Sequence, residues 1–291
     1  MIIDIPTNTN FANITFTLNR NISSSRSVFT NRQRTQEYDG VFWSAELTLP
    51  PLKRTDALEW VTFLTRLQGV KNTFLLGDPS HTTNSGTYNE TFLATDNLIS
   101  DTSETLSFTA STKTISSANS IFNTALVGAF ILVSGATNDD NNGTFKITAK
   151  TSNTAVVVDR DLVDESSTAS CKVQQNVKGV TGLSLNQLAS GTGTIKKGDF
   201  LAIFDGAATT ANRVQLVMAT ADATETSQSG SPNHYSVSIQ PKLRADLANT
   251  HYVGFSSTYN QSRFRLAEND VKWTANQVSL YGISLAFTEV I

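Results

Sequence analysis

Side chains that could bind a metal ion are most concentrated in one short stretch, Asn138-Asp139-Asp140-Asn141-Asn142-Gly143. Oxygen ligands at alternate positions followed by glycine are typical of calcium loops, which a bidentate Glu completes at the twelfth position. That position holds Ala149 instead. Because Asn-Gly between apolar strands favours a hairpin turn, the sequence predicts a turn here, with a weak, opportunistic cation site as the alternative.

Nucleophiles and metal ligands are otherwise sparse. The chain has three histidines, His81, His234 and His251, and one cysteine, Cys171. Their spacing in the sequence is not that of metal ligands. The run from Gly182 to Asn186 lacks the second glycine of a nucleophile elbow, and Gly-Lys-Ser/Thr, the end of a phosphate-binding loop, does not occur. We therefore expect no catalytic, metal-binding or cofactor-binding residues and a protein that is not an enzyme. A hydrolase with two carboxylates from distant strands stays a minor alternative.

The composition favours strands with one solvated face. Hydrophobic residues make up 39% of the 291 residues and charged residues only 16%, with much Ser, Thr and Asn. The net charge is −3, and residues 81–240 hold 14 Asp/Glu against 9 Lys/Arg, which argues against a nucleic-acid-binding protein. One cysteine excludes an intrachain disulfide. We expect no signal peptide and, without an apolar run of 18 residues, no membrane span.

A strand-helix-strand pattern occupies residues 41–76. Residues 41–49 alternate apolar and polar side chains, and Pro50-Pro51 ends that strand. Apolar residues then recur at three- and four-residue spacing, which predicts a helix capped by Thr55 or Asp56. Gly69 supplies a left-handed stop before a strand at 74–76.

A polar, basic segment precedes this pattern. It carries four arginines before the first acid, Glu37: Arg20, Arg26, Arg32 and Arg34. The pattern predicts a solvated hairpin. The functional interpretation is an arm that faces a polar lumen or a neighbouring subunit.

The central region contains two further groups of strands. Apolar runs near 130–133, 144–149 and 155–158 indicate one β-module, and alternating runs at 200–204, 214–218 and 235–239 indicate a second. The last residues form another strand. We predict a mainly-β protein in which 1–85 plus 246–291 make one discontinuous domain, with inserted modules at 86–178 and 179–245. The predicted core of the discontinuous domain is Trp43, Leu47, Trp60, Leu64, Phe74, Trp273, Tyr281 and Phe287.

Several motifs resemble distal tail proteins of long-tailed bacteriophages. The run WSAELTLPPL at 43–52, the helix end LTRLQG at 64–69 and FLLGDP at 74–79 resemble the N-terminal domain of that family. KGDF at 197–200 with IQPKLR at 239–244, then FRL at 264–266 with YGISLAFTE at 281–289, are similar to its later segments. The resemblance covers the two ends and the second insert.

The resemblance implies a tail-tube-like β-sandwich with one flanking helix, formed by both chain ends and carrying small barrel or sandwich modules. It implies a homo-oligomeric ring, of six copies, that joins the tail tube protein to the tail hub and fibres. DNA would pass through the lumen without specific binding, and no cofactor is implied. The protein would be made in the host bacterial cytoplasm and reside in the virion. Since a positive lumen would retard DNA, we favour subunit contacts for the four arginines.

The main alternative is a host-surface carbohydrate-binding module, an adhesin, within residues 106–240. Sugar binding would require solvent-exposed aromatic rings on the inserts. The rings to examine are Phe122, Phe130, Phe204 and Tyr235.

Overall fold

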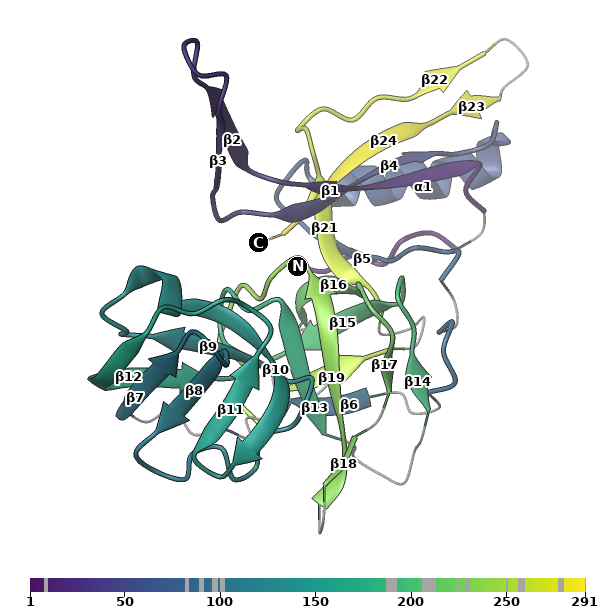
Figure 1. Ribbon diagram of the computed structural model, residues 1–291. Helices are drawn as coiled ribbons and strands as arrows, with labels where there is room; N and C mark the ends of the chain where they lie inside the picture. Colours follow the sequence, from purple (N-terminus) through teal and green to yellow (C-terminus); the bar gives the residue numbers. More distant parts are fainter. Residues whose placement is uncertain are drawn as a thin grey trace. The chain divides into compact units, whose positions relative to one another are not determined.

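The computed structural model describes residues 1–7, 10–81, 84–88, 92–95, 99, 103–186, 193–205, 213–224, 226–228, 231–249, 251–255, 260–276 and 280–290. The chain forms two compact units (Figure 1). The smaller unit combines Met1–Ser80 with Gln261–Ile291, and the larger unit is His81–Asn260. Strands dominate both, and the described residues include one α-helix. The predicted mainly-β class with a flanking helix is therefore confirmed.

Both ends of the chain contribute strands to one antiparallel sheet in the smaller unit. The strand order is β1-β4-β24-β21-β5, so the C-terminal strand β24 lies between two segments that are distant in sequence. The bounds are β1 Asn13–Asn19, β4 Phe42–Thr48, β5 Phe74–Leu76, β21 Ser262–Leu266 and β24 Ser284–Glu289.

Helix α1, Arg54–Leu67, covers the apolar face of this sheet. Its side chains Trp60 and Phe63 continue a row of edge-to-face rings that includes Phe74 and Phe287, with successive ring centroids 5.8, 5.4 and 4.8 Å apart. The opposite sheet face carries Ser, Thr and charged side chains, as the period of two requires.

The ends of α1 differ from the predicted caps. Lys53 precedes the helix without a side-chain capping bond, and Thr55 and Asp56 lie inside the first turn, so their assignment as caps is wrong. Gln68 already adopts the left-handed conformation at φ 52°, and Gly69 follows at φ 66°. The stop thus begins one residue before the predicted glycine.

A buried carboxylate joins three strands of the sheet. Glu289 on β24 accepts hydrogen bonds from the Trp43 backbone N–H at 3.1 Å and from the Ser262 hydroxyl at 2.9 Å. These partners lie on β4 and β21. Because a buried carboxylate is tolerated only with hydrogen-bond partners, Glu289 specifies how the C-terminal strand joins the sheet.

Two hairpins extend from the smaller unit's sheet (Figure 1). The first pairs β2, Ile22–Arg26, with β3, Gln33–Glu37, and fulfils the prediction of a polar hairpin. The second pairs β22, Thr274–Ala275, with β23, Tyr281–Gly282.

A closed antiparallel barrel forms the first part of the larger unit. Its strand order is β10-β11-β8-β7-β12-β9, and closure leaves a core of buried aliphatic and aromatic side chains. The 3₁₀ turn η1, Asp139–Asn141, lies between β9 and β10. The strand bounds are β7 Ser103–Thr109, β8 Thr114–Ser117, β9 Phe130–Ser134, β10 Gly143–Ser152, β11 Ala155–Val158 and β12 Glu165–Gln174.

A seven-stranded antiparallel sheet forms the second part, in the order β13-β6-β20-β15-β16-β19-β18 with an additional β13–β19 pairing. Two short strands of the same part, β14, Thr194–Ile195, and β17, Ala223–Thr224, pair with each other as a separate two-stranded sheet. The bounds are β6 Phe92–Thr95, β13 Gly182–Asn186, β15 Phe200–Phe204, β16 Arg213–Ala219, β18 Thr226–Gln228, β19 Ser231–Gln240 and β20 Tyr252–Gly254.

Strand pairing places the observed boundaries elsewhere than the predicted ones. Strand β20, at 252–254, pairs with β15 and β6, so residues 246–260 belong to the larger unit and not to the domain of the chain ends. Strand β6, at 92–95, joins the same sheet, although it was expected in the module 86–178. Both boundary predictions were wrong for the same reason, which is that the pairing partners of these short strands lie far away in the sequence.

Candidate assembly surface

Exposed apolar side chains are concentrated in the smaller unit. Among the described residues, eleven large hydrophobic side chains are exposed, and only Val127 and Val163 belong to the larger unit. The nine in the smaller unit are Met1, Ile22, Val28, Phe29, Tyr38, Leu58, Val70, Trp273 and Leu280. Single exposed apolar residues are ordinary, but a concentration on one part of a protein indicates a contact surface.

The hairpin β2–β3 carries the most exposed of these side chains at its tip. Val28 is 95% and Phe29 98% exposed. The tip loop is closed by backbone hydrogen bonds from Ser27 to Arg32 and from Asn31 to Ser27, both 2.9 Å. Asn31 takes the left-handed conformation that this closure needs, at φ 57°. Val28 and Phe29 are therefore held at the end of an ordered projection, which we call the apolar tip.

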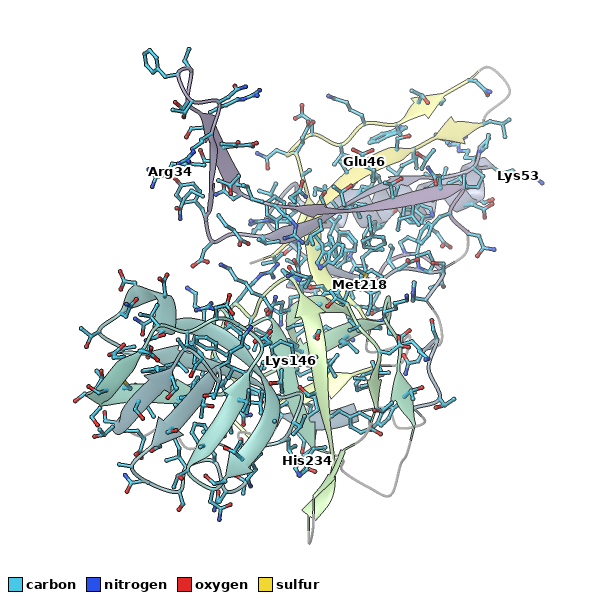
Figure 2. All side chains as sticks on the ribbon, in the orientation of Figure 1. Arg34, Glu46, Lys53, Lys146, Met218 and His234 are labelled. Carbon is cyan, nitrogen blue, oxygen red and sulfur yellow. The ribbon has the colours of Figure 1, made fainter. Side chains whose placement is uncertain are left out.

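The four predicted arm arginines all lie on or next to this hairpin and are all exposed. Arg26 ends β2 and Arg34 lies opposite Ser25 on β3, so both flank the tip loop that contains Arg32. Arg20 lies between β1 and β2, at the base. Figure 2 shows the side chains of the hairpin, Arg34 among them, extending outward from both strands. The structure thus brings three of the arginines together around the apolar tip.

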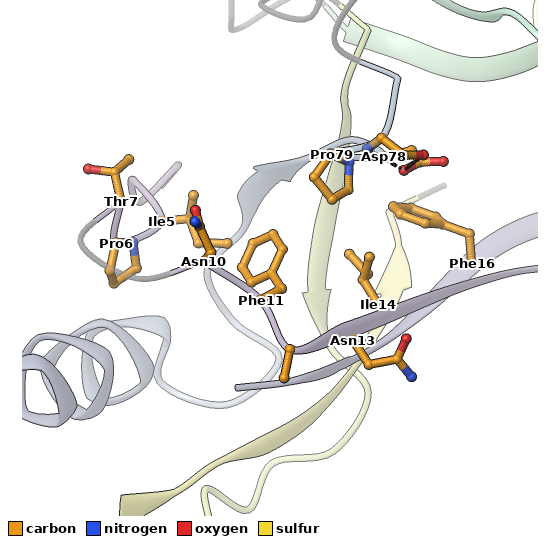
Figure 3. A pocket seen from close by; sticks show the side chains of 12 residues that line it. Ile5, Pro6, Thr7, Asn10, Phe11, Asn13, Ile14, Phe16, Asp78 and Pro79 are labelled. Carbon is orange, nitrogen blue, oxygen red and sulfur yellow. Dashed lines mark hydrogen bonds between the residues drawn. The ribbon is translucent and has the colours of Figure 1, made fainter. Parts of the chain in front are cut away.

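A groove of about 810 Å³ lies on the same unit, beside the edge strand β1. Phe11 and Ile14 point from one wall toward Pro79 on the other, as Figure 3 shows. Ile5 and Pro6 line one end, and Phe16 lines the other with Asp78. The inward-facing side chains of β1, Ile14, Phe16 and Leu18, are only half-buried.

Acidic side chains lie around the groove. Asp78 lines it directly, and its carboxylate accepts hydrogen bonds from the backbone N–H and hydroxyl of Ser80 at 2.8 and 2.6 Å. A smaller recess shares Pro6 with the groove and contains Asp4 and Glu59 together with Arg66. The net charge around the groove is therefore negative, whereas the apolar tip is flanked by positive charge.

The predicted core of the smaller unit is correct for six of eight residues. Trp43, Leu47, Trp60, Leu64, Phe74 and Phe287 are buried. Trp273 is 46% exposed and Tyr281 half-buried, so the core assignment of these two residues is wrong. Both belong to the β22–β23 hairpin region, which leaves the five-stranded sheet. Tyr281 continues the sequence alternation of the buried residues Ile283, Leu285 and Phe287, but it pairs in the β22–β23 hairpin, so the period extends beyond the five-stranded sheet.

Two features of this surface were missed by sequence reasoning. Val28-Phe29 is an apolar pair inside an otherwise polar run, and that contrast is a signal that could have identified the tip. The groove has no comparable signal, because its walls come from residues 5–16 and 78–80, which only the tertiary fold brings together.

The calcium-like stretch of the larger unit forms a turn, as predicted. Asn138 caps η1 by accepting a hydrogen bond from the Asp140 N–H. Glu165 receives hydrogen bonds from the Asn141 amide and from two backbone N–H groups of the turn. Partial burial raises the pKa of Glu165, but its hydrogen bonds with Thr168, Asn141 and the turn backbone outweigh that effect and lower it to about 2. The carboxylate therefore serves as an anchor for the turn.

His251 is held at both ring nitrogens. Its Nδ1 accepts from the Ala248 N–H at 2.6 Å, so Nε2 carries the proton donated to Asp205 at 2.6 Å. With both nitrogens occupied, the ring has no site left to act as a general base. His81 packs edge-on against Phe200, and His234 is buried within β19. The three histidines thus lie at separate places in the larger unit.

Cys171 is fully buried in the barrel core. Burial raises the pKa of its thiol, and the nearby Glu165 raises it further. The thiol is therefore neutral and shielded, as the predicted core role requires.

The aromatic rings proposed for sugar binding do not form an exposed platform. Phe122, Phe204 and Tyr235 are buried. Phe130 is half-buried, and a Cβ at Gly182 would lie 2.0 Å from its ring, so the ring is packed against the backbone of β13. These four residues give no motive for a carbohydrate site.

Within the part of the chain that the structure describes, no group of three or more His, Cys, Asp or Glu side chains is positioned to hold a metal ion. In the same residues, no helix has both the length and the apolar character needed to cross a membrane. Neither a family model nor a curated protein matches this chain.

Proposed function

We propose that this chain is a structural virion protein, an adaptor at the distal end of a bacteriophage tail. In this proposal the smaller unit assembles into a homo-oligomeric ring, of six copies, between the tail tube protein and the tail hub and fibres. The observation that carries it is the concentration of exposed apolar side chains on the unit built from both chain ends. The same unit contains most of the motifs that resemble distal tail proteins.

The geometry of the smaller unit suits repeated association. Its apolar tip and its groove are different surfaces of one chain, and a contact between different surfaces is heterologous. Heterologous contacts produce rings when their rotation closes. Edge strand β1 adds a row of backbone groups next to the groove, and such edges are common assembly surfaces.

The larger unit would serve as the peripheral part of the adaptor. It is inserted between the two segments of the smaller unit, and its chain enters and leaves near residues 80 and 261. An insertion at one point leaves the assembling sheet intact, because both unit-1 segments still pair through β4, β24 and β21. We propose that this unit contacts fibres or other tail-tip components.

The arginines of the hairpin fit subunit contacts better than a DNA-lined channel. Clustered Arg26, Arg32 and Arg34 would bind phosphates if they lined the lumen, and each phosphate contact slows release. In the proposal DNA passes through the ring without specific binding, so these charges face protein.

Imaging of the purified full-length chain by negative-stain electron microscopy tests the proposal. We expect closed rings with an axial opening and six-fold class averages. Particles of monomer size, or aggregates without a closed shape, at concentrations of tens of micromolar before dilution would contradict it.

A further inference from the structure

We propose that the apolar tip of one copy, Val28 and Phe29, inserts into the Ile5–Ser80 groove of the next copy. The inference rests on the proposed function, because it assumes that the smaller unit self-associates. It adds the two surfaces that meet and the direction of the contact. The occupant of the groove is a second copy of this chain.

The tip has the properties of an inserting group. Phe29 is 98% exposed, yet the loop that carries it is ordered by two backbone hydrogen bonds and by a contact of the Thr30 N–H with the Ser27 hydroxyl at 3.3 Å. An ordered loop loses little conformational freedom when it docks, which favours binding. A fully exposed aromatic on such a loop gains the most from burial in a partner.

The groove has matching properties. Its walls present Phe11, Ile14 and Phe16 on one side and Pro79 on the other (Figure 3). Phe11 also packs edge-on against the buried Trp60, with ring centroids 6.2 Å apart, and Phe16 against Phe264 at 6.1 Å. The groove walls are therefore anchored in the core of the smaller unit. At about 810 Å³ the groove has room for two apolar side chains.

The tip of a chain cannot reach its own groove. Strand β1 ends at Asn19, only three residues after the groove residue Phe16, and the hairpin then leads outward from that point. The five residues of β2, Ile22–Arg26, span roughly 16 Å, and Val28 lies beyond their end. Backbone pairing along the whole of β2–β3 holds the tip at that distance, so a tip that enters the groove comes from another molecule.

Charge selects a second copy as that molecule. Arg26, Arg32 and Arg34 surround the tip, and the hairpin carries no acid before Glu37. The groove carries Asp78, and in the adjoining recess the two acids Asp4 and Glu59 outnumber the one base, Arg66. Docking places positive charge next to negative charge, which steers the encounter and fixes its orientation. The two surfaces are thus both apolar at their centres and opposite in the sign of their surrounding charge.

A mixing experiment with two full-length variants tests the contact. The double variant Val28→Ser/Phe29→Ser removes the apolar side chains of the tip and keeps the groove. The variant Ile14→Lys keeps the tip and places a positive charge in the groove, where it repels the arginines that flank an incoming tip. Ile14 is half-buried, so a lysine can extend its ammonium to water. We expect each variant alone to require at least about tenfold more protein for assembly than the natural chain. Mixed in equal amounts, they should form a dimer of one copy each, measured by analytical ultracentrifugation.

Engineered disulfides give a readout independent of affinity. Phe29→Cys combined with Asn10→Cys places one thiol at the tip and one at the groove, and the native Cys171 is fully buried. Oxidation should yield a ladder of covalent oligomers, because a disulfide requires Cα atoms within about 7 Å. The matched control, Phe29→Cys with Val127→Cys, places the second thiol on an exposed residue of the larger unit and should yield no ladder.

The outcomes separate this inference from the proposed function. The inference alone is overturned if the natural chain forms rings and Val28→Ser/Phe29→Ser assembles at the same protein concentration as the natural chain. Equal cross-linking of the test and control cysteine pairs also overturns it alone. A natural chain that stays monomeric overturns the proposed function, and the tip–groove contact with it.

Discussion

The larger unit closes its apolar surfaces on themselves, whereas the smaller unit leaves part of its apolar surface open. The barrel buries a continuous cluster from Leu106 to Val173, and the seven-stranded sheet buries another from Leu183 to Phe255. In the smaller unit one helix covers one face of a five-stranded sheet, and the β1 edge stays half-buried beside the groove. A unit that has closed its core is complete as a monomer. A unit that exposes a tip and a groove leaves apolar surface available, and we propose that a neighbouring copy completes it.

The largest expected effect follows from the dependence of the smaller unit on one helix. Trp60→Ala removes a fully buried indole that contacts Phe11 and Phe63. We expect the free energy of unfolding of the smaller unit to fall by about 3–5 kcal/mol. Calorimetry should show its transition moving to lower temperature, while the transition of the larger unit stays in place.

The matched control for this change lies on the same helix. Leu58 is half-exposed, so Leu58→Ala should alter stability by no more than about 0.5 kcal/mol. Equal shifts of both transitions in Trp60→Ala would mean that the two units unfold together, and the comparison of separate units would then be wrong.

A packing change in the larger unit should have an intermediate effect. Gly182→Ala adds a methyl group 2.0 Å from the Phe130 ring, where β13 of the sheet meets β9 of the barrel. Overpacking of this kind costs about 1–3 kcal/mol, and it should lower only the transition of the larger unit. In the Phe130→Ala background the added methyl group has room, so the double variant Gly182→Ala/Phe130→Ala should have a higher free energy of unfolding than Phe130→Ala alone. Strict additivity would show that the two residues do not touch.

The acid response should also belong to the larger unit. The pKa of Glu165 is lowered to about 2 in the fold, against about 4.3 in an unfolded chain. The ionised carboxylate therefore stabilises the fold above pH 4.3, and this contribution is lost as the pH falls toward 2. Glu165→Gln should be less stable at pH 7 and should show a flatter decline in stability between pH 5 and 2.

Denaturant unfolding of the larger unit at a series of pH values measures this difference. All three tryptophans, Trp43, Trp60 and Trp273, belong to the smaller unit, so tryptophan fluorescence does not report on Glu165. Hydrogen exchange of the backbone amides in the 137–143 turn reports on Glu165 directly. Parallel pH curves for Glu165→Gln and the natural chain would refute the anchoring role of this carboxylate.

The smallest expected effect tests a corrected assignment. Trp273 is 46% exposed, so Trp273→Ser should change the free energy of unfolding of the smaller unit by less than about 1 kcal/mol. A core tryptophan would cost about 3–5 kcal/mol instead. Fluorescence of the remaining Trp43 and Trp60 follows the unfolding, and a loss in the higher range would restore Trp273 to the core.

Regular periods made much of the smaller unit predictable from sequence. The alternation over 41–49 identified β4, and the three- and four-residue spacing after Pro51 identified α1. In both, one repeating pattern extends over at least two helical turns or three strand repeats, so burial of one face determines the structure. The polar hairpin at 20–38 was predicted for a related reason, since turn-forming and charged residues surround its strands.

Features that depend on tertiary pairing were not predictable in the same way. Strands β6 and β20 are three to four residues long, and their place in the larger unit follows from partners more than 50 residues away. The groove likewise needs residues 5–16 beside 78–80. Trp273 shows the opposite error, because an apolar pattern in the sequence suggested burial, whereas its segment leads into the β22–β23 hairpin and lies outside the five-stranded sheet.

The most direct test of the account is the mass of the full-length chain in solution, measured by sedimentation from nanomolar to tens of micromolar protein. We predict a reversible transition from a 31.5 kDa monomer to one closed species roughly six times that mass, with no continued growth. A mass of 31.5 kDa over the whole range, or growth without a limiting size, would contradict the claim that the smaller unit is completed by a ring of its own copies.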